Sequence, residues 1–239
     1  MSKGFDKLIH YFSKLELTLW GTSVFFIVSS FLIFDRSNYM TLAASLIGVT
    51  SILINAKGNP LGQLLMVLFS FLYGVISYTF SYYGEMITYL GMTMPMAVFS
   101  LIAWLRNPYE GNKSEVAVNQ ISKRETVLMC GLTVVVTGVF YYILQAFHTA
   151  NLVPSTISVT TSFLAVYLTF RRSPYFSLAY AANDVVLIVL WTLASMEDIR
   201  YVSVIVCFMA FFANDIYGFI SWRKMEVRQK MPQKSLALE

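Results

Sequence analysis

The chain has 239 residues, of which 57% are apolar, 16% aromatic and only 13% charged. A soluble domain of this length does not need so much apolar surface, so the composition indicates a polytopic membrane protein. The basic residues behind the net charge of +4 lie between apolar runs and at the chain ends, which argues against a nucleic-acid-binding surface. Cys130 and Cys207 fall inside apolar runs, so we predict neither a disulfide framework nor a metal site.

Eight apolar runs follow one another along the chain. The first, residues 17–34, comes after a polar leader that contains Lys3, Lys7 and Lys14. It is longer than the apolar region of a typical signal peptide and no small-residue cleavage site follows it, so we expect it to remain as a transmembrane helix. The other runs cover residues 40–55, 61–83, 86–104, 126–144, 153–170, 175–193 and 201–222. Most approach the roughly 20 helical residues that cross about 30 Å of hydrocarbon, which predicts eight transmembrane helices.

The positions of the basic residues predict the orientation of these helices. With eight spans, 15 of the 17 Lys and Arg residues fall on the side of the N-terminus, and only Arg36 and Arg200 fall on the other side. Short cytoplasmic loops carry the excess of Lys and Arg in membrane proteins. We therefore expect a multi-pass protein with both termini in the cytoplasm.

The two halves of the chain resemble each other weakly. Aligning Pro60 with Pro174 matches the third span to the seventh, and aligning Trp104 with Trp222 matches the fourth span to the eighth. Corresponding segments lie four spans apart and so run in the same direction, which predicts parallel repeats with a substrate site between them near the midplane. The predicted fold is an all-α polytopic membrane protein with two parallel three-helix-bundle repeats, a linker helix that joins them and an additional N-terminal helix.

The predicted organisation has five parts. They are a cytoplasmic leader with the additional transmembrane helix (1–39), the first repeat (40–104), a cytoplasmic loop with the linker helix (105–152), the second repeat (153–222) and a basic cytoplasmic tail (223–239).

Two Asn-Asp pairs lie inside the last two predicted spans, Asn183-Asp184 and Asn214-Asp215. Each pair is about 12 Å from the cytoplasmic end of its helix and therefore close to the midplane. Polar and ionisable groups are costly at that depth, which makes these residues candidates for a ligand site. Two alternatives stay open: the pairs could only hydrogen-bond neighbouring helices, or the carboxylates could carry protons or cations.

Other residues extend this candidate substrate site. They are Trp191, Tyr217, Ser70, Tyr73 and Gln63. Asp184 and Trp191 are seven residues apart, so a carboxylate and an aromatic ring share one helix face. Amides can bind a carboxamide or a ribose, and an acid with an aromatic ring can hold an organic cation. One face of the third span carries a stripe of polar and small residues, Gln63, Ser70, Gly74, Ser77 and Ser81, for which simple helix packing is the alternative.

Pro95 and three tryptophans complete the features of interest. Pro95 lies within the fourth span and is expected to kink it. Trp20, Trp104 and Trp222 lie near helix ends, where we expect them to anchor the helices at the membrane interface. The sequence contains no phosphate loop, zinc-protease motif or nucleophile elbow. We therefore predict neither an enzyme nor an ATP-driven pump, and no cofactor.

Three stretches of the sequence resemble the PnuC family of bacterial nicotinamide riboside transporters. They are YGEMITYLGM (83–92), AYAAND (179–184) and NDIYGFISW (214–222), and the resemblance extends over residues 40–224. It implies a fold similar to that of the SWEET sugar transporters, a homo-oligomer that we expect to be a trimer, and a location in the bacterial inner membrane. It also implies facilitated diffusion of this NAD precursor, kept downhill by a separate cytoplasmic kinase that phosphorylates it.

The resemblance assigns Asn183 and Asn214 to the substrate and places Tyr217 in the same signature. Phe69 and Met96 occupy the positions aligned with these asparagines in the first half. We therefore expect the second half to supply most polar contacts.

The working hypothesis is a carrier with alternating access. The asparagines would bind the polar edges of the riboside, Trp191 and Tyr217 would pack against its ring, and Asp184 or Asp215 would offset its positive charge or hold the amides. A carrier of a related vitamin such as thiamine, an ion or proton channel and a membrane scaffold that transports nothing are the alternatives.

Overall fold

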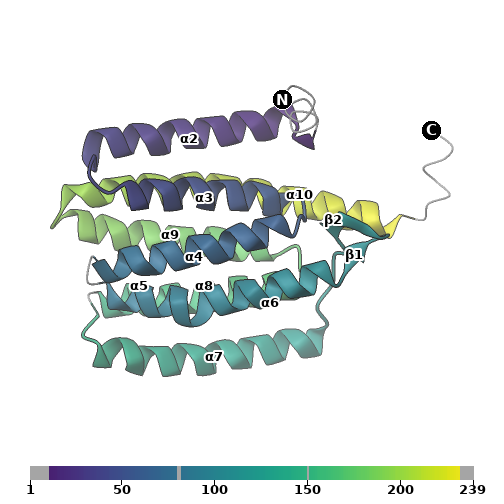
Figure 1. Cartoon of the computed structure of the whole chain (residues 1–239). Helices are drawn as coiled ribbons and strands as arrows, with labels where there is room; N and C mark the ends of the chain where they lie inside the picture. The colour runs from purple at the N-terminus through teal and green to yellow at the C-terminus, as the bar shows by residue number, and fades with distance from the viewer. Residues whose placement is uncertain (1–10, 80–81, 150, 232–239) are drawn as a thin grey trace.

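The computed structural model describes residues 11–79, 82–149 and 151–231, and within them it contains eight helices long and apolar enough to cross a membrane. The predicted number of spans is therefore confirmed. The helices lie side by side in one bundle (Figure 1). The first part of the predicted leader, with Lys3 and Lys7, and the end of the predicted tail lie outside the described residues.

Polar side chains mark where several helices begin. The bounds are α2 (Lys14–Phe34), α3 (Tyr39–Ala56), α4 (Leu61–Thr79), α5 (Tyr83–Thr88), the π-helix η1 (Tyr89–Thr93), α6 (Met94–Leu105), α7 (Lys123–Ala146), α8 (Leu152–Phe170), α9 (Phe176–Ser195), the 3-10 helix η2 (Ile199–Tyr201) and α10 (Val202–Lys230). Helices α2, α3 and α7 follow Ser13, Asn38 and Ser122, whose side chains accept hydrogen bonds from the first turn. Such caps satisfy backbone N–H groups that have no partner inside the helix.

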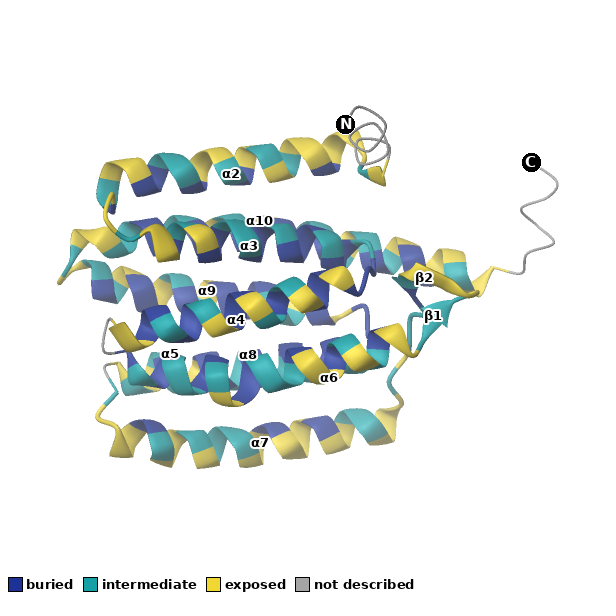
Figure 2. Cartoon of the chain, in the orientation of Figure 1, coloured by how far each residue is buried: buried dark blue, intermediate teal, exposed yellow. Residues whose placement is uncertain are grey.

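Helices α2 and α7 form two edges of the bundle, and the remaining spans lie between them (Figure 1). Both edge helices have exposed residues along their length (Figure 2). The exposed apolar side chains include Phe25 and Phe26 on α2 and Val127 and Val134 on α7. Lipid tails can cover such surfaces, because apolar side chains need no partner in hydrocarbon. Inside the bundle, α9 packs against α8 and α10, and α3 packs against α4 and α10.

The fourth span contains the irregularity expected at Pro95, in the form of a π-helical turn rather than a simple kink. The π-helix Tyr89–Thr93 directly precedes Met94, where α6 begins. Proline has no N–H to donate and displaces the carbonyl one turn before it, so a wider turn accommodates it. This turn buries Tyr89, Met92 and Thr93 in the interior of the bundle.

Polar elements extend the end of the bundle at which α2 begins. This end holds Lys57, Arg106, Arg171, Arg172, Arg223 and Lys224 and is called the basic end below. An antiparallel hairpin of β1 (Pro108–Tyr109) and β2 (Asn112–Val116) lies against the last turns of α10 (Figure 1). The N–H of Val118 donates to Gln229 at 2.8 Å, and Arg228 pairs with Glu115. The sequence analysis predicted neither the hairpin nor the continuation of α10 past residue 222.

Trp104 and Trp222 are fully buried at the basic end, so the prediction that they are interface anchors is wrong. Trp104 Nε1 donates to the carbonyl of Thr169 at 2.9 Å, and Trp222 Nε1 donates to the carbonyl of Asn55 at 2.8 Å. Each carbonyl belongs to the penultimate residue of its helix, α8 or α3. The two indole rings lie 5.3 Å apart between centroids. Each half of the chain therefore binds the other half through the same kind of contact.

Candidate functional site

A cavity of about 30 Å³ lies in the interior of the bundle, between α3, α4, η1, α8, α9 and α10. Its polar lining consists of Asn55, Thr93, Ser162, Asn183, Asp184 and Asp215. Its aromatic lining consists of Phe69, Tyr89, Phe176, Tyr180, Phe208 and Phe211. A volume of this size accommodates about one water molecule, so a vitamin-sized ligand requires the lining side chains to move.

Asn183 is held in a defined orientation by α8. Its side-chain oxygen accepts hydrogen bonds from Thr161 Oγ1 at 2.7 Å and from Ser162 Oγ at 3.0 Å. Two hydroxyl groups of one neighbouring helix thus occupy the acceptor end of the amide. The amide nitrogen can only donate, and it has no hydrogen-bond acceptor among the described residues, so its two N–H groups are available to the cavity.

Asp184 and Asp215 place two carboxyl groups in the same cavity. Both residues are buried, and their side chains are hydrogen-bonded to each other. Asp184 Oδ2 accepts no hydrogen bond from a donor in the described part of the chain. None of the ion pairs among the described residues includes either aspartate. The pair is therefore the acidic part of the cavity wall.

Asn214 and Tyr217 lie on the side of α10 that faces α2 and do not line the cavity. Asn214 Nδ2 donates to Ser23 Oγ and to the carbonyl of Ala210, both at 2.8 Å. The hydroxyl of Tyr217 donates to Glu16 at 2.9 Å. Both residues of the signature therefore hold the additional helix against α10.

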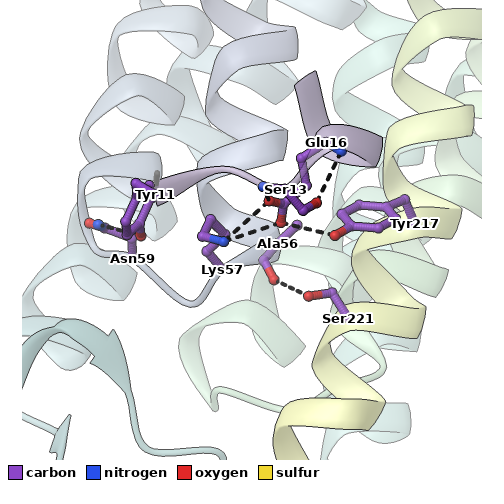
Figure 3. A network of polar contacts seen from close by, with 8 residues as sticks. All are labelled: Tyr11, Ser13, Glu16, Ala56, Lys57, Asn59, Tyr217 and Ser221. Atoms are coloured by element: carbon purple, nitrogen blue, oxygen red, sulfur yellow. Dashed lines mark hydrogen bonds and ion pairs between the residues drawn. The ribbon is translucent and has the colours of Figure 1, made fainter. Parts of the chain in front are cut away.

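Glu16 is the centre of a polar network at the basic end (Figure 3). This carboxylate is only 3% exposed, although it lies near the end of a helix. It accepts hydrogen bonds from the N–H of Ser13 at 2.6 Å, from Lys57 Nζ at 3.3 Å and from Tyr217. Lys57 Nζ also lies 4.7 Å from the ring centre of Tyr11, and burial raises the pKa of that phenol, which stays neutral. The network joins α2 to the segment after α3 and to α10.

An aromatic layer separates the cavity from the end opposite to the basic end. Trp191 Nε1 donates to the hydroxyl of Tyr73 at 2.7 Å, and the ring of Tyr73 lies 4.4 Å from that of Tyr89, which lines the cavity. Trp191 also packs against Tyr82 at 4.9 Å between ring centroids. Burial raises the pKa of Tyr82 to about 12, so its phenol is neutral. Trp191 and Tyr73 therefore lie next to the cavity wall and not in it.

A second aromatic layer lies on the side of the basic end. Phe176 lines the cavity, and its ring centroid is 4.8 Å from that of Trp222 and 6.2 Å from that of Trp104. Gly218 allows α9 and α10 to approach closely nearby, because a Cβ atom there would lie 2.8 Å from Ser177 Oγ. The cavity thus lies between two layers of aromatic rings.

Gln63 and Ser70 support the wall formed by the first half of the chain. Gln63 Nε2 donates to Asn55 Oδ1 at 2.9 Å, so Gln63 reaches the cavity only through Asn55. Ser70 is buried beside Phe69, and its hydroxyl has no partner among the described residues. The neighbouring Phe69 lines the cavity and Ser70 does not, so the wall at this point is aromatic.

The aromatic lining was missed by the sequence analysis, although part of it follows from helical spacing. Tyr180 lies four residues before Asp184, and Phe211 lies four residues before Asp215, so each shares a helix face with its aspartate. Extending the polar positions by one turn would have identified both rings. Tyr89 could not be found in this way, because the π-helical turn changes the helical spacing there.

Comparisons with known proteins indicate a transporter. Residues 38–224 match the sequence model of a family described as "Nicotinamide mononucleotide transporter". A relative from Neisseria mucosa, named nicotinamide riboside transporter PnuC, is 24% identical over 202 residues, which cover 82% of this chain and 76% of the relative. A solved structure described as "Crystal structure of the Vitamin B3 transporter PnuC" has a TM-score of 0.79 and 21% identity, covering 92% of this chain and 94% of that chain. The two chains share a fold, and the family match includes every residue that lines the cavity.

Proposed function

Because the chain belongs to the nicotinamide mononucleotide transporter family, whose members are membrane transporters, we propose that it carries nicotinamide riboside across the membrane. The observation that supports this best is the composition of the cavity. It brings the amide of Asn183 together with the carboxyl groups of Asp184 and Asp215 and with six aromatic rings. The riboside has a carboxamide, a ribose and a positively charged ring. The amide of the cavity can bind the first two groups, and the carboxyl groups and aromatic rings can bind the charged ring.

The charge of the cavity favours the riboside over its phosphorylated form. The lining residues include two carboxyl groups and no Lys, Arg or His. A phosphate monoester would bring negative charge next to these carboxyl groups, in an environment that does not screen the repulsion. The cationic ring of the riboside is instead attracted by the same carboxyl groups.

The residues at the cavity have separate roles in this proposal. Asn183 donates its N–H groups to the carboxamide or to ribose oxygens, the aspartates face the charged ring, and Tyr89 and Phe211 pack against the ring face. Phe211 covers Gly48, where a Cβ atom would lie 2.2 Å from Phe211 Cζ, so this ring is tightly seated.

The other predicted site residues act at the borders of the site. Trp191 and Tyr73 belong to the aromatic layer on the side opposite to the basic end, and Asn214 and Tyr217 hold α2. Ser70 and Gln63 support the wall. We therefore propose that these six residues influence opening and closing more than the contact with the ligand.

We infer that transport proceeds by alternating access. The cavity is contracted and has aromatic layers on two sides, so each layer has to open in turn. Rocking of one three-helix unit against the other would accomplish this. The reciprocal bonds of Trp104 and Trp222 support the idea that the two units are equivalent repeats. Transport would be facilitated diffusion, and a separate kinase that phosphorylates the riboside would keep it downhill.

The orientation and assembly follow from the same reasoning. We propose that the basic end faces the cytoplasm of a bacterial cell, with the protein in the inner membrane, because the basic loops gather at that end. We also propose a homo-oligomer, which we expect to be a trimer from the resemblance described above. The exposed apolar faces of α2 and α7 would contact lipid or another copy of the chain.

Calorimetric titration of the purified protein tests the proposed function. The ligands are nicotinamide riboside, nicotinamide, nicotinic acid, nicotinamide mononucleotide and thiamine. Tight binding of the riboside alone would support the proposal, and binding of thiamine alone would replace the substrate but keep a cationic vitamin. Binding of none of them by folded protein would reject it, and ion currents through a bilayer that contains the protein would then support a channel.

A further inference from the structure

The two aspartates of the cavity are close enough to share a hydrogen bond, although they come from different helices. Asp184 lies on α9 and Asp215 on α10, with exposed fractions of 4% and 3%. Their side chains hydrogen-bond to each other. A carboxylate can only accept, so a hydrogen bond between two carboxyl groups requires a proton on one of them. The geometry therefore suits one negative charge on the pair.

The surroundings of the pair offer no positive charge to balance a second negative one. The titratable groups that interact with Asp184 from the packed elements are Tyr89 of η1, Tyr180 of α9 and Cys207 of α10. All three are uncharged near neutral pH. The lining residues contributed by α3, α4 and α8 are uncharged as well. Two carboxyl groups that share one site in this way retain one proton between them.

We propose that Asp184 and Asp215 hold one shared proton throughout the transport cycle, so that the site carries a single negative charge and selects a singly charged organic cation. This inference rests on the function proposed above for the same cavity. It has two consequences. The protein should prefer a cationic ligand over a neutral ligand of the same shape, and transport should move no proton together with the substrate.

Two ligands of nearly the same size, one with a charged ring and one with a neutral ring, test the first consequence. Nicotinamide riboside has a cationic ring, whereas its reduced form has a neutral dihydropyridine ring with the same carboxamide and ribose. Calorimetry gives the ratio of their affinities. We expect the unmodified protein to favour the cation by at least about tenfold, since one charge is matched in a poorly screened site.

Three variants test whether the preference for the cationic ligand depends on Asp184 and Asp215. Asp184→Asn and Asp215→Asn each keep one carboxylate and supply an amide N–H that can donate to it, so the preference should persist even where both affinities fall. The double variant has no charge, and its affinity ratio should fall to about one. Glu85→Gln is the matched control, because Glu85 is another buried carboxyl group that does not line the cavity. It should keep the preference.

The second consequence needs only the unmodified protein, so it can be tested even if the double variant does not fold. Titration with the riboside in two buffers of different ionisation enthalpy counts the protons released on binding. We expect none. Release or uptake of one proton for each bound riboside would show that the number of protons on the pair changes when the ligand binds, and would overturn the inference.

The remaining outcomes separate this inference from the proposed function. Equal affinity of the unmodified protein for both ligands, loss of the preference in either single variant, or its loss in Glu85→Gln would overturn the inference alone. An unmodified, folded protein that binds neither ligand would overturn the proposed function and this inference with it.

Discussion

In the proposed site, the side chain of Asn183 is already oriented before a ligand arrives. Thr161 and Ser162 on α8 occupy its oxygen. The amide cannot rotate to present the oxygen to the cavity without breaking both bonds, each of which contributes about 1 kcal/mol. The N–H donors therefore point in a fixed direction. Because the side chain is already fixed, a ligand that binds it causes a smaller loss of conformational entropy.

Asn183→Leu is expected to weaken riboside binding by at least about tenfold, because it removes the amide donors and also the acceptor of the Ser162 hydroxyl. Calorimetry of the folded variant measures the effect. Thr161→Val is the matched control, since it removes one of the two orienting hydroxyls and keeps the amide. Thr161→Val should lower the affinity for the riboside by about threefold. Unchanged binding by Asn183→Leu would remove Asn183 from the proposed site.

The depth of a residue could be predicted from the sequence, but the direction of its side chain could not. Asp215 and Asn214 lie at nearly the same depth in α10, yet Asp215 lines the cavity and Asn214 faces α2. Adjacent positions on a helix point about 100° apart, and only the neighbouring helices determine which direction faces the cavity. Contact of Asn214, Trp191 or Tyr217 with the substrate therefore stays a prediction that binding measurements have to test.

At the scale of elements, α2 is bound to the rest of the protein by polar contacts, although it lies outside the residues matched by the family. Ser23 accepts from Asn214, and Glu16 accepts from Lys57 and Tyr217. An exposed ion pair contributes little, but Glu16 is buried and has several donors. Helix α2 is therefore positioned to affect how far α10 can move at the basic end.

Glu16→Ala and Tyr217→Phe should each lower the stability of the protein, and the two effects should be coupled by about 1 kcal/mol, because each change removes one partner of the same hydrogen bond. Denaturant unfolding of the two single variants and the double variant in detergent gives the coupling energy. Thr18→Ala is the control on the same helix, since Thr18 Oγ1 donates to the carbonyl of Lys14 within α2 and has no bond to another helix in the described part of the chain. Its effect should simply add to that of Tyr217→Phe. Additive effects of Glu16→Ala and Tyr217→Phe would contradict the network.

The π-helical turn before Pro95 determines where Tyr89 points. Pro95→Ala restores an N–H donor, so the turn can change to a regular α-helix, which removes the cost of the missing bond. We expect a higher unfolding temperature together with slower riboside uptake in proteoliposomes, because Tyr89 would leave its place in the wall. Unchanged uptake despite a stabilised fold would show that the π-helical turn is not needed for transport.

At the scale of the whole molecule, Trp104 and Trp222 connect the two halves at the basic end. Trp104→Phe and Trp222→Phe each remove one bond to a buried carbonyl and should favour opening at that end. Ser162→Cys in a protein without Cys130 and Cys207 provides a reporter on the cavity wall. An impermeant maleimide should label it several-fold faster from the basic side in either variant. Faster labelling only from the opposite side would contradict the role assigned to the two tryptophans.

The bundle could be predicted from the sequence because each span has a strong and local signal in its apolar composition. The elements outside the membrane lack this signal. The hairpin of β1 and β2 and the last turns of α10 are polar. They are stabilised by contacts between distant parts of the chain, such as the hydrogen bond between Val118 and Gln229. The two tryptophans at the basic end were misread for a related reason, since a position near a helix end is compatible both with the membrane interface and with burial between helices.

The small size of the cavity also has a consequence for the cell. Ions and protons cross a bilayer along continuous files of water, and a space for about one water molecule between two layers of rings interrupts such a file. We therefore expect an unloaded copy of this protein not to conduct ions. A bacterium could therefore keep many idle copies in its membrane while the electrical potential that drives its other transport and its ATP synthesis stays intact.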